Sequence, residues 1–323
     1  MQKPDLRLHI GLHKTGSTRM QRDLMRRKKH LTTRGVEIFG PKNLRLSQWR
    51  YFWETSLALV LRKKGLAKGV VHNVALAVEI AQSNACRAVV ISDEELAGSI
   101  NKILKSGVLY PDIAARMRCL DPVLRGGHVV VVITVRNYAD IFASLYAHRL
   151  KTRPLADFDT YKKAFLLMKR RWGDVVADVT KAIPGAKILV IRFEDVIKNP
   201  HSALCHTVGD TRLGKSEKHH IILQSPSAAA VAALHGLRGL KRRDKKARKQ
   251  VMEAFPRNKH PAFDPWSIEE RQFLDQLYRD DMANFALINT ARVIYSDLSR
   301  MPKRALVKTT TPIGGAANVT QKS

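Results

Sequence analysis

Four short runs of β-branched and aliphatic residues divide the chain and predict buried strands, at 6–10, 87–92, 128–135 and 187–193. The third run, HVVVVITV, has no polar alternation, a pattern typical of a parallel strand that is covered on both faces. Long segments with helical periodicity separate the four runs. The pattern therefore predicts an α/β fold in which helices flank a parallel β-sheet.

Helical periodicity is strongest between 158 and 183, where apolar side chains recur at three- and four-residue steps. This stripe predicts one long amphipathic helix that packs against the core and does not form a cofactor site. Its members are Phe158, Tyr161, Phe165, Met168, Trp172, Val175, Val179 and Ile183. Another helix is predicted to begin at Ser267, because Ser267 and Glu270 form a capping box.

The length of 323 residues suffices for one large α/β domain, which we place at 1–302. The segment 303–323 is rich in Thr, Gly and Lys without periodicity, so a disordered tail is predicted there. Cys86, Cys119 and Cys205 are far apart and indicate neither a disulfide framework nor a zinc site. The first strand leaves no room for a signal peptide, and no apolar run has the length of a transmembrane segment. We therefore expect a cytoplasmic protein.

The loop after the first predicted strand has the composition of an anion-binding site. Gly11, Gly16 and Thr18 keep the frame of a nucleotide P-loop, which runs Gly, four residues, Gly, Lys and then Ser or Thr. The lysine has moved: Ser17 occupies its position and Lys14 lies three residues earlier. A strand followed by glycines and a helix start directs free backbone N–H groups at an anion. The loop thus predicts a phosphate or sulfate site, the alternative being an ordinary βα turn with chance glycine spacing.

The segment 14–18, KTGST, resembles the phosphosulfate loop of sulfotransferases that use 3′-phosphoadenosine 5′-phosphosulfate (PAPS). The resemblance continues after the strand at 128–135, where Arg136 follows directly and Ser144 lies eight residues later, the family's spacing for gripping the 3′-phosphate. An arginine can donate two parallel hydrogen bonds to a phosphate, and a serine hydroxyl can add another. Tyr138 stands where the family usually has a proline. The segment 187–200 also resembles the family's late strand and Glu-Asp turn, in which Glu194 and Asp195 are expected to be structural.

This resemblance implies a P-loop NTPase-like sulfotransferase fold, similar to the soluble bacterial members related to glycan sulfotransferases. It implies in-line transfer of a sulfuryl group from PAPS to an acceptor hydroxyl, less often an amine, with adenosine 3′,5′-bisphosphate as the second product. The charge of Lys14 would offset the negative charge that grows on the bridging oxygen, so Lys14 is also a catalytic candidate. Sulfuryl transfer involves fewer negative charges than phosphoryl transfer, so no metal is expected. The donor-binding residues implied are Lys14, Thr15, Gly16, Ser17, Thr18, Arg136 and Ser144.

Two residues are candidates for the general base that takes the acceptor's proton. Glu94 follows the strand at 87–92 within ISDEEL, which resembles an Ile-Ser-x-Glu segment of glycan-type sulfotransferases, and its two acidic neighbours compete with it. His13 lies inside the loop and is the second candidate. Alternatively, Ser92 and Asp93 cap the next helix, and Glu94 only favours the N-terminus of that helix. His148 is expected at the surface.

Fifty-seven Lys and Arg residues against twenty-eight Asp and Glu give a net charge of +29. This excess indicates an acidic partner and tilts the acceptor toward an anionic glycan or lipid. The densest basic run, 241–249, lacks interleaved aromatic residues and matches no recognition module, so no specific nucleic acid is expected. The run predicts a solvated helix face or a surface that holds an anionic glycan or closes over the donor. The rival classes are a P-loop small-molecule kinase and a basic nucleic-acid-binding protein on a nucleotide-binding fold.

Overall fold

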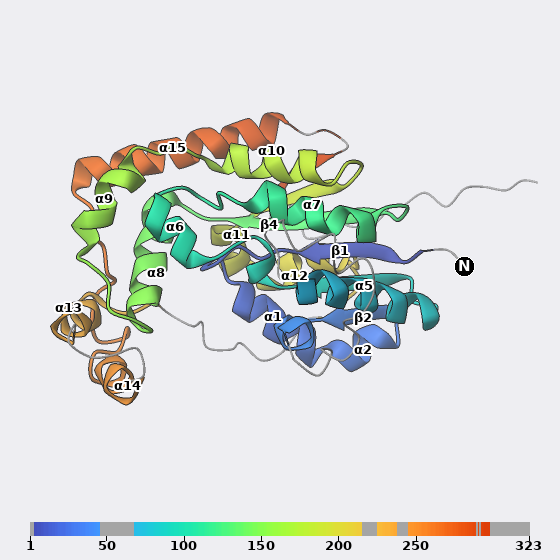
Figure 1. Cartoon of the computed structure of the whole chain (residues 1–323), viewed down its shortest axis with the longest axis horizontal. Helices are drawn as coiled ribbons and strands as arrows, with labels where there is room; N and C mark the ends of the chain where they lie inside the picture. Colours follow the sequence, from blue (N-terminus) through green and yellow to red (C-terminus); the bar gives the residue numbers. More distant parts are fainter. Residues whose placement is uncertain are drawn as a thin grey trace, which may run out of the picture.

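A six-stranded, all-parallel sheet with strand order β2-β3-β1-β4-β5-β6 forms the centre of the computed structural model (Figure 1). The structure describes residues 3–45, 68–214, 225–237, 245–288, 290 and 292–297, so the predicted tail at 303–323 lies outside the described residues. The parallel α/β sheet predicted from the sequence is confirmed. The strands are β1 (Asp5–His9), β2 (Val36–Phe39), β3 (Ala88–Ser92), β4 (Val129–Val135), β5 (Lys187–Arg192) and β6 (Val293–Ser296).

The four strands predicted from the sequence correspond to β1, β3, β4 and β5, each within one residue at either end. The sequence pattern missed β2 and β6, the two edge strands. Both have only four residues, and β2 includes the charged Glu37. In a segment of this length, the hydrophobic pattern does not distinguish a strand from a loop.

Helices cover both faces of the sheet, and side chains alternate between them along each strand. In β4, Val130 and Val132 join one apolar cluster with α1, α2 and α12, whereas Val131 and Ile133 join a larger cluster with α5, α7, α8 and α10. Figure 1 shows α1 and α2 below the sheet and α10 and α15 above it. The described helices are α1 (Ser17–Arg26), α2 (Lys28–Thr32), α3 (Pro41–Arg45), α5 (Lys68–Ser83), the 3₁₀ helix η3 (Glu94–Leu96), α6 (Ile100–Ser106), α7 (Ile113–Leu124), α8 (Tyr138–Leu150), α9 (Phe158–Leu166), α10 (Trp172–Ala182), α11 (Phe193–Lys198), α12 (Pro200–Val208), α13 (Ala228–Gly236), α14 (Lys245–Ala254) and α15 (Ile268–Leu287).

The single long helix predicted for 158–183 is wrong, because the segment forms α9 and α10 with a break between them. Met168 adopts a positive φ of 40° in the break, and the backbone N–H of Arg171 donates to Asp174 as α10 begins. Phe165 and Trp172, on either side of the break, are both fully buried in one core. The apolar stripe therefore reports burial correctly, but it does not report helix continuity.

The capping box predicted at Ser267 is confirmed at the start of α15. The Ser267 N–H donates to the Glu270 carboxylate at 2.8 Å, and the Glu270 N–H donates to the Ser267 hydroxyl at 3.2 Å. Within the described ranges, no helix combines the length and apolar character needed to cross a bilayer.

The strand order places β1 at the centre, with β3 on one side and β4 on the other. The chain fills the β2–β3 side first and then crosses β1 to form β4, so the direction of winding reverses there. In open parallel sheets, the crevice beyond the carboxyl ends of such strands is the usual ligand site. The loop after β1 and the residue after β4 both lie at this edge.

Candidate functional site

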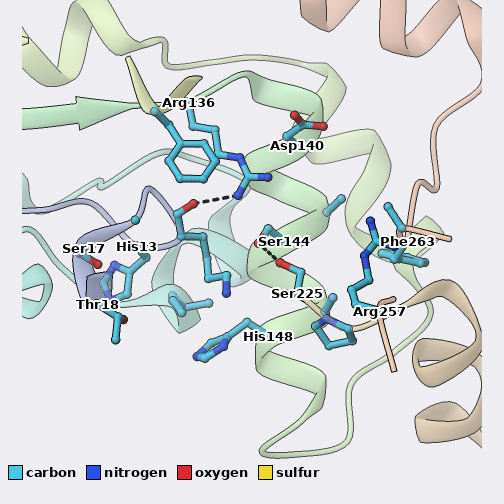
Figure 2. Close-up of a pocket in the computed structure, with 18 of the residues that line it drawn as sticks. His13, Ser17, Thr18, Arg136, Asp140, Ser144, His148, Ser225, Arg257 and Phe263 are labelled. Carbon is cyan, nitrogen blue, oxygen red and sulfur yellow. Dashed lines mark hydrogen bonds between the residues drawn. The ribbon is translucent and has the colours of Figure 1, made fainter. Parts of the chain in front are cut away.

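A cavity of about 470 Å³ opens at the carboxyl ends of β1 and β4 (Figure 2). Its walls come from the loop after β1, the starts of α1 and α11, one face of α8, and the segments around 225–226 and 257–264. All the predicted site residues except Thr15 line it, namely His13, Lys14, Gly16, Ser17, Thr18, Glu94, Arg136 and Ser144. Residues predicted from separate motifs therefore meet at one place.

Two glycines and a threonine hold the loop after β1 in a tight turn. Gly11 adopts φ of 27°, and a Cβ there would lie 2.7 Å from the His9 ring. Gly16, at φ of 86°, is the N-cap residue of α1. The Thr15 side chain is buried, and both its hydroxyl and its N–H donate to the Leu12 carbonyl. Thr15 thus shapes the loop and does not line the cavity, so its predicted donor-binding role is not supported by this geometry.

Backbone N–H groups at the start of α1 are available to an anion. Within the described chain, the amides of Gly16, Ser17 and Thr18 have no protein acceptor. They belong to the first turn of a ten-residue helix, where the orphan amides and the helix dipole favour negative charge. The three residues also line the cavity, so this end of it is suited to a phosphate or sulfate group.

Lys14 is held in the cavity in an unusual backbone conformation. Its φ of 65° lies in the left-handed region, which costs an ordinary residue roughly 1–2 kcal/mol. Burial, together with the positive charges of Lys151 and Arg136, lowers the pKa of its ammonium group to about 8. No carboxylate in the described part of the chain forms an ion pair with Lys14. A strained backbone and an uncompensated cation together indicate a binding role.

Arg136 connects the end of β4 to the loop after β1. Its Nη1 donates to the Lys14 carbonyl at 2.8 Å, and its guanidinium group lies over the Phe193 ring at 4.5 Å (Figure 2). The Arg136 carbonyl accepts a hydrogen bond from Trp172 Nε1 at 2.8 Å. Its Nε is buried and has no partner among the described residues. The arginine is therefore fixed in direction while one donor is left unsatisfied.

Helix α8 carries Ser144 into the cavity. The helix begins after Asn137, whose side-chain oxygen accepts from the Ala139 N–H at 2.9 Å. Ser144 is buried, and its hydroxyl lies 2.6 Å from the hydroxyl of Ser225, which comes from a distant part of the chain. Tyr138, which stands where the resembling family has a proline, is fully buried and donates to Asp281. Tyr138 therefore serves packing and is not among the residues that line the cavity.

The two predicted base candidates both line the cavity but differ in their partners. Glu94 accepts a hydrogen bond from Gln21 Nε2 at 2.7 Å, and the cap of η3 is supplied by Asp93, whose side chain accepts from the Glu95 N–H. His13 has both ring nitrogens engaged. Its Nδ1 lies 3.3 Å from the Tyr110 hydroxyl, and its Nε2 lies 3.5 Å from Glu95.

The cavity residues that sequence reasoning missed include His148 on α8 and Lys151 directly after this helix. His148, expected at the surface, is only partly exposed and lines the cavity, as does Lys151. They follow Ser144 by four and seven residues, which places all three on one face of the helix. Counting one and two helical turns onward from Ser144 would have predicted both residues from the sequence.

Other predicted features have structural roles where they are described. Glu194 accepts from the Asn137 N–H and the Tyr278 hydroxyl, and Asp195 accepts two hydrogen bonds from Arg192, which agrees with their predicted structural role. Of the basic run at 241–249, residues 241–244 lie outside the described residues. Arg248 is buried and donates to the Leu150 carbonyl, so a fully solvated face is wrong at this position.

No protein-family model matches the chain, and no curated protein matches its sequence. In the described ranges, no group of three or more His, Cys, Asp or Glu side chains is arranged to hold a metal ion.

Proposed function

We propose that the protein is a sulfotransferase that moves a sulfuryl group from PAPS to a hydroxyl of an acceptor. The observation that carries the proposal is the convergence of two motifs. Lys14 and Arg136 are 122 residues apart in sequence, yet they are joined by a hydrogen bond and line one cavity with Ser144. The resemblance to PAPS-dependent sulfotransferases selected these three residues from the sequence, and all three line the same cavity.

The chemistry of the lining fits a donor with two anionic ends. Lys14 and the free amides of Gly16, Ser17 and Thr18 would hold the phosphosulfate end. Arg136 and Ser144 would hold the 3′-phosphate, with the unsatisfied Nε of Arg136 as an additional donor. PAPS, when bound, supplies the activated sulfuryl group.

The cavity volume also suits such a donor. About 470 Å³ falls inside the range of roughly 300–1,000 Å³ that small-molecule sites occupy.

The position of the lysine favours sulfuryl transfer over a kinase reaction. A kinase P-loop has its lysine directly after the second glycine, where this chain has Ser17. Lys14 instead approaches from the middle of the loop, and its charge would offset negative charge on the departing phosphate. No metal is needed in this proposal, because a sulfuryl group carries fewer negative charges than a phosphoryl group.

A second lysine adds positive charge to the cavity. Lys151 lines it and, like Lys14, has no carboxylate ion-pair partner in the described part of the chain. Together with the net charge of +29, this favours an anionic acceptor such as an acidic glycan or lipid. Glu94 and His13, the two proton acceptors proposed from the sequence, both line the cavity, and neighbouring side chains engage both of them.

Transfer of a labelled sulfuryl group tests the proposal. The protein is incubated with ³⁵S-labelled PAPS and a panel of glycans, lipids and phenols, and the labelled products are separated. Release of labelled sulfate to water is measured as well. We expect transfer that is lost in Lys14→Ala and unchanged in Lys29→Ala, an exposed lysine on α2. A wild-type protein that releases no label to any acceptor, water included, contradicts the proposed function.

A further inference from the structure

His148 lines the cavity and is not one of the residues proposed to bind the donor. It lies one turn beyond Ser144 on α8, and Figure 2 shows its side chain reaching from the helix toward the side where His13 and Thr18 lie. The residue is partly buried, so the ring has access to the cavity while the helix fixes its direction.

The ring nitrogens of His148 are free, which sets it apart from the other histidine of the cavity. Within the described residues, neither nitrogen of His148 has a hydrogen-bond partner. His13, by contrast, faces Tyr110 and Glu95 with its two nitrogens. A group that accepts a proton from a substrate needs an unoccupied atom within reach of that substrate.

The charges around His148 keep its imidazole neutral. Burial and the electrostatic influence of Lys14, Lys151 and His13 lower its pKa to about 4, while the nearby Glu94 carboxylate acts in the opposite direction. The ring is therefore a neutral base throughout the physiological range. An anion bound beside Lys14 and Lys151 would offset their repulsion, so the ring becomes more basic when the cavity is filled.

We infer that His148 is a catalytic residue that takes the proton of the acceptor hydroxyl, an assignment that rests on the proposed sulfotransfer. As the acceptor oxygen forms its bond to sulfur, the bond from sulfur to the bridging oxygen breaks, and that oxygen leaves with the electron pair on adenosine 3′,5′-bisphosphate. The hydroxyl proton moves to a ring nitrogen of His148 and is later released to water. Glu94 then supports the imidazolium ion by its negative charge and does not itself accept the proton.

Turnover of His148 variants tests this assignment. The assay uses ³⁵S-labelled PAPS and the panel compound that the wild-type protein sulfates fastest. If no compound of the panel is sulfated, hydrolysis by water is measured instead. His30→Ala, which replaces an exposed histidine on α2, is the matched control. We expect His148→Ala and His148→Asn to lose about a hundredfold or more in turnover, with adenosine 3′,5′-bisphosphate affinity within about twofold of wild type. Added imidazole should restore part of the turnover of His148→Ala only. Turnover of both variants within threefold of wild type, or loss in Glu94→Gln alone, overturns the inference.

A second readout does not depend on turnover. The ring C–H resonance of His148, identified by its absence in His148→Ala, is followed against pH by NMR with and without adenosine 3′,5′-bisphosphate. We expect the ring to titrate near 4 in the free protein and at higher pH in the complex. A ring that titrates at its ordinary pH and ignores the ligand overturns the inference. Wild-type protein that neither binds this ligand nor releases label contradicts the proposed function itself, so the two failures are distinguishable.

Discussion

Raising the pH from 7 to 9 should weaken the binding of adenosine 3′,5′-bisphosphate, because the ammonium group of Lys14 loses its proton in this interval. Burial and the charges of Lys151 and Arg136 lower the pKa of Lys14 to about 8 in the free protein. A lysine with a depressed pKa is charged below that value and neutral above it. Anion binding is therefore favoured on the acid side and declines on the alkaline side.

The magnitude follows from the protonated fraction of Lys14. With a pKa of about 8, this fraction is about nine-tenths at pH 7 and about one-tenth at pH 9. If the charged form is the one that binds, affinity falls about tenfold, or ~1.4 kcal/mol. An unshifted lysine would remain almost fully charged over the same interval, and the affinity would stay constant.

Titration calorimetry at several pH values measures this change, and substitutions separate its causes. Lys14→Arg should bind with an affinity that is flat from pH 7 to 9, since an arginine keeps its charge. Lys14→Met should bind roughly tenfold to a hundredfold more weakly at pH 7 and also show a flat profile. The control Lys29→Met removes an exposed charge and should retain the wild-type decline. A wild-type affinity that does not change between pH 7 and 9 refutes the role given to Lys14.

Three further substitutions test Arg136, Glu94 and the core packing of Phe165 separately. Arg136→Ala should weaken adenosine 3′,5′-bisphosphate binding by roughly tenfold or more but leave adenosine 5′-phosphate binding almost unchanged, and equal losses for both ligands would contradict its place at the 3′-phosphate. Glu94→Gln should lower turnover while donor affinity is retained, and wild-type turnover would return Glu94 to a purely structural role. Phe165→Ala removes a fully buried ring stacked 4.3 Å from Phe142 and should lower the free energy of unfolding by about 3–5 kcal/mol in denaturant titrations, so a loss below about 1 kcal/mol would contradict the packing.

The strands and the anion-binding loop could be predicted because their signals are local. Seven consecutive buried residues form β4, and a strand buried on both faces needs an unbroken apolar run. Gly16 must adopt a positive φ at the start of α1, so the glycine is visible in the sequence for the same reason that the turn forms. Arg136 follows because side chains at the carboxyl ends of neighbouring parallel strands share one edge of the sheet.

The remainder of the cavity depends on contacts between distant segments. Ser225 reaches Ser144 from 81 residues away, and Phe263 lines the cavity from further along the chain. His148 is a different case, because its place one turn after Ser144 on α8 was available from helical periodicity. Met168 shows where helical periodicity misleads. Its positive φ interrupts the helix, although the apolar residues keep their helical spacing on both sides of it.

Equilibrium binding of adenosine 3′,5′-bisphosphate compared with that of ATP is the sharpest test of whether the cavity is a PAPS site. Calorimetry on the full chain, with and without Mg²⁺, distinguishes a site built for a 3′-phosphate from a triphosphate site. We expect adenosine 3′,5′-bisphosphate to bind without Mg²⁺ and at least about tenfold more tightly than ATP, since Arg136 and Ser144 contribute charge-assisted and neutral hydrogen bonds to the 3′-phosphate alone. Tight binding of ATP that requires Mg²⁺, with no binding of adenosine 3′,5′-bisphosphate, would contradict the account and favour a kinase.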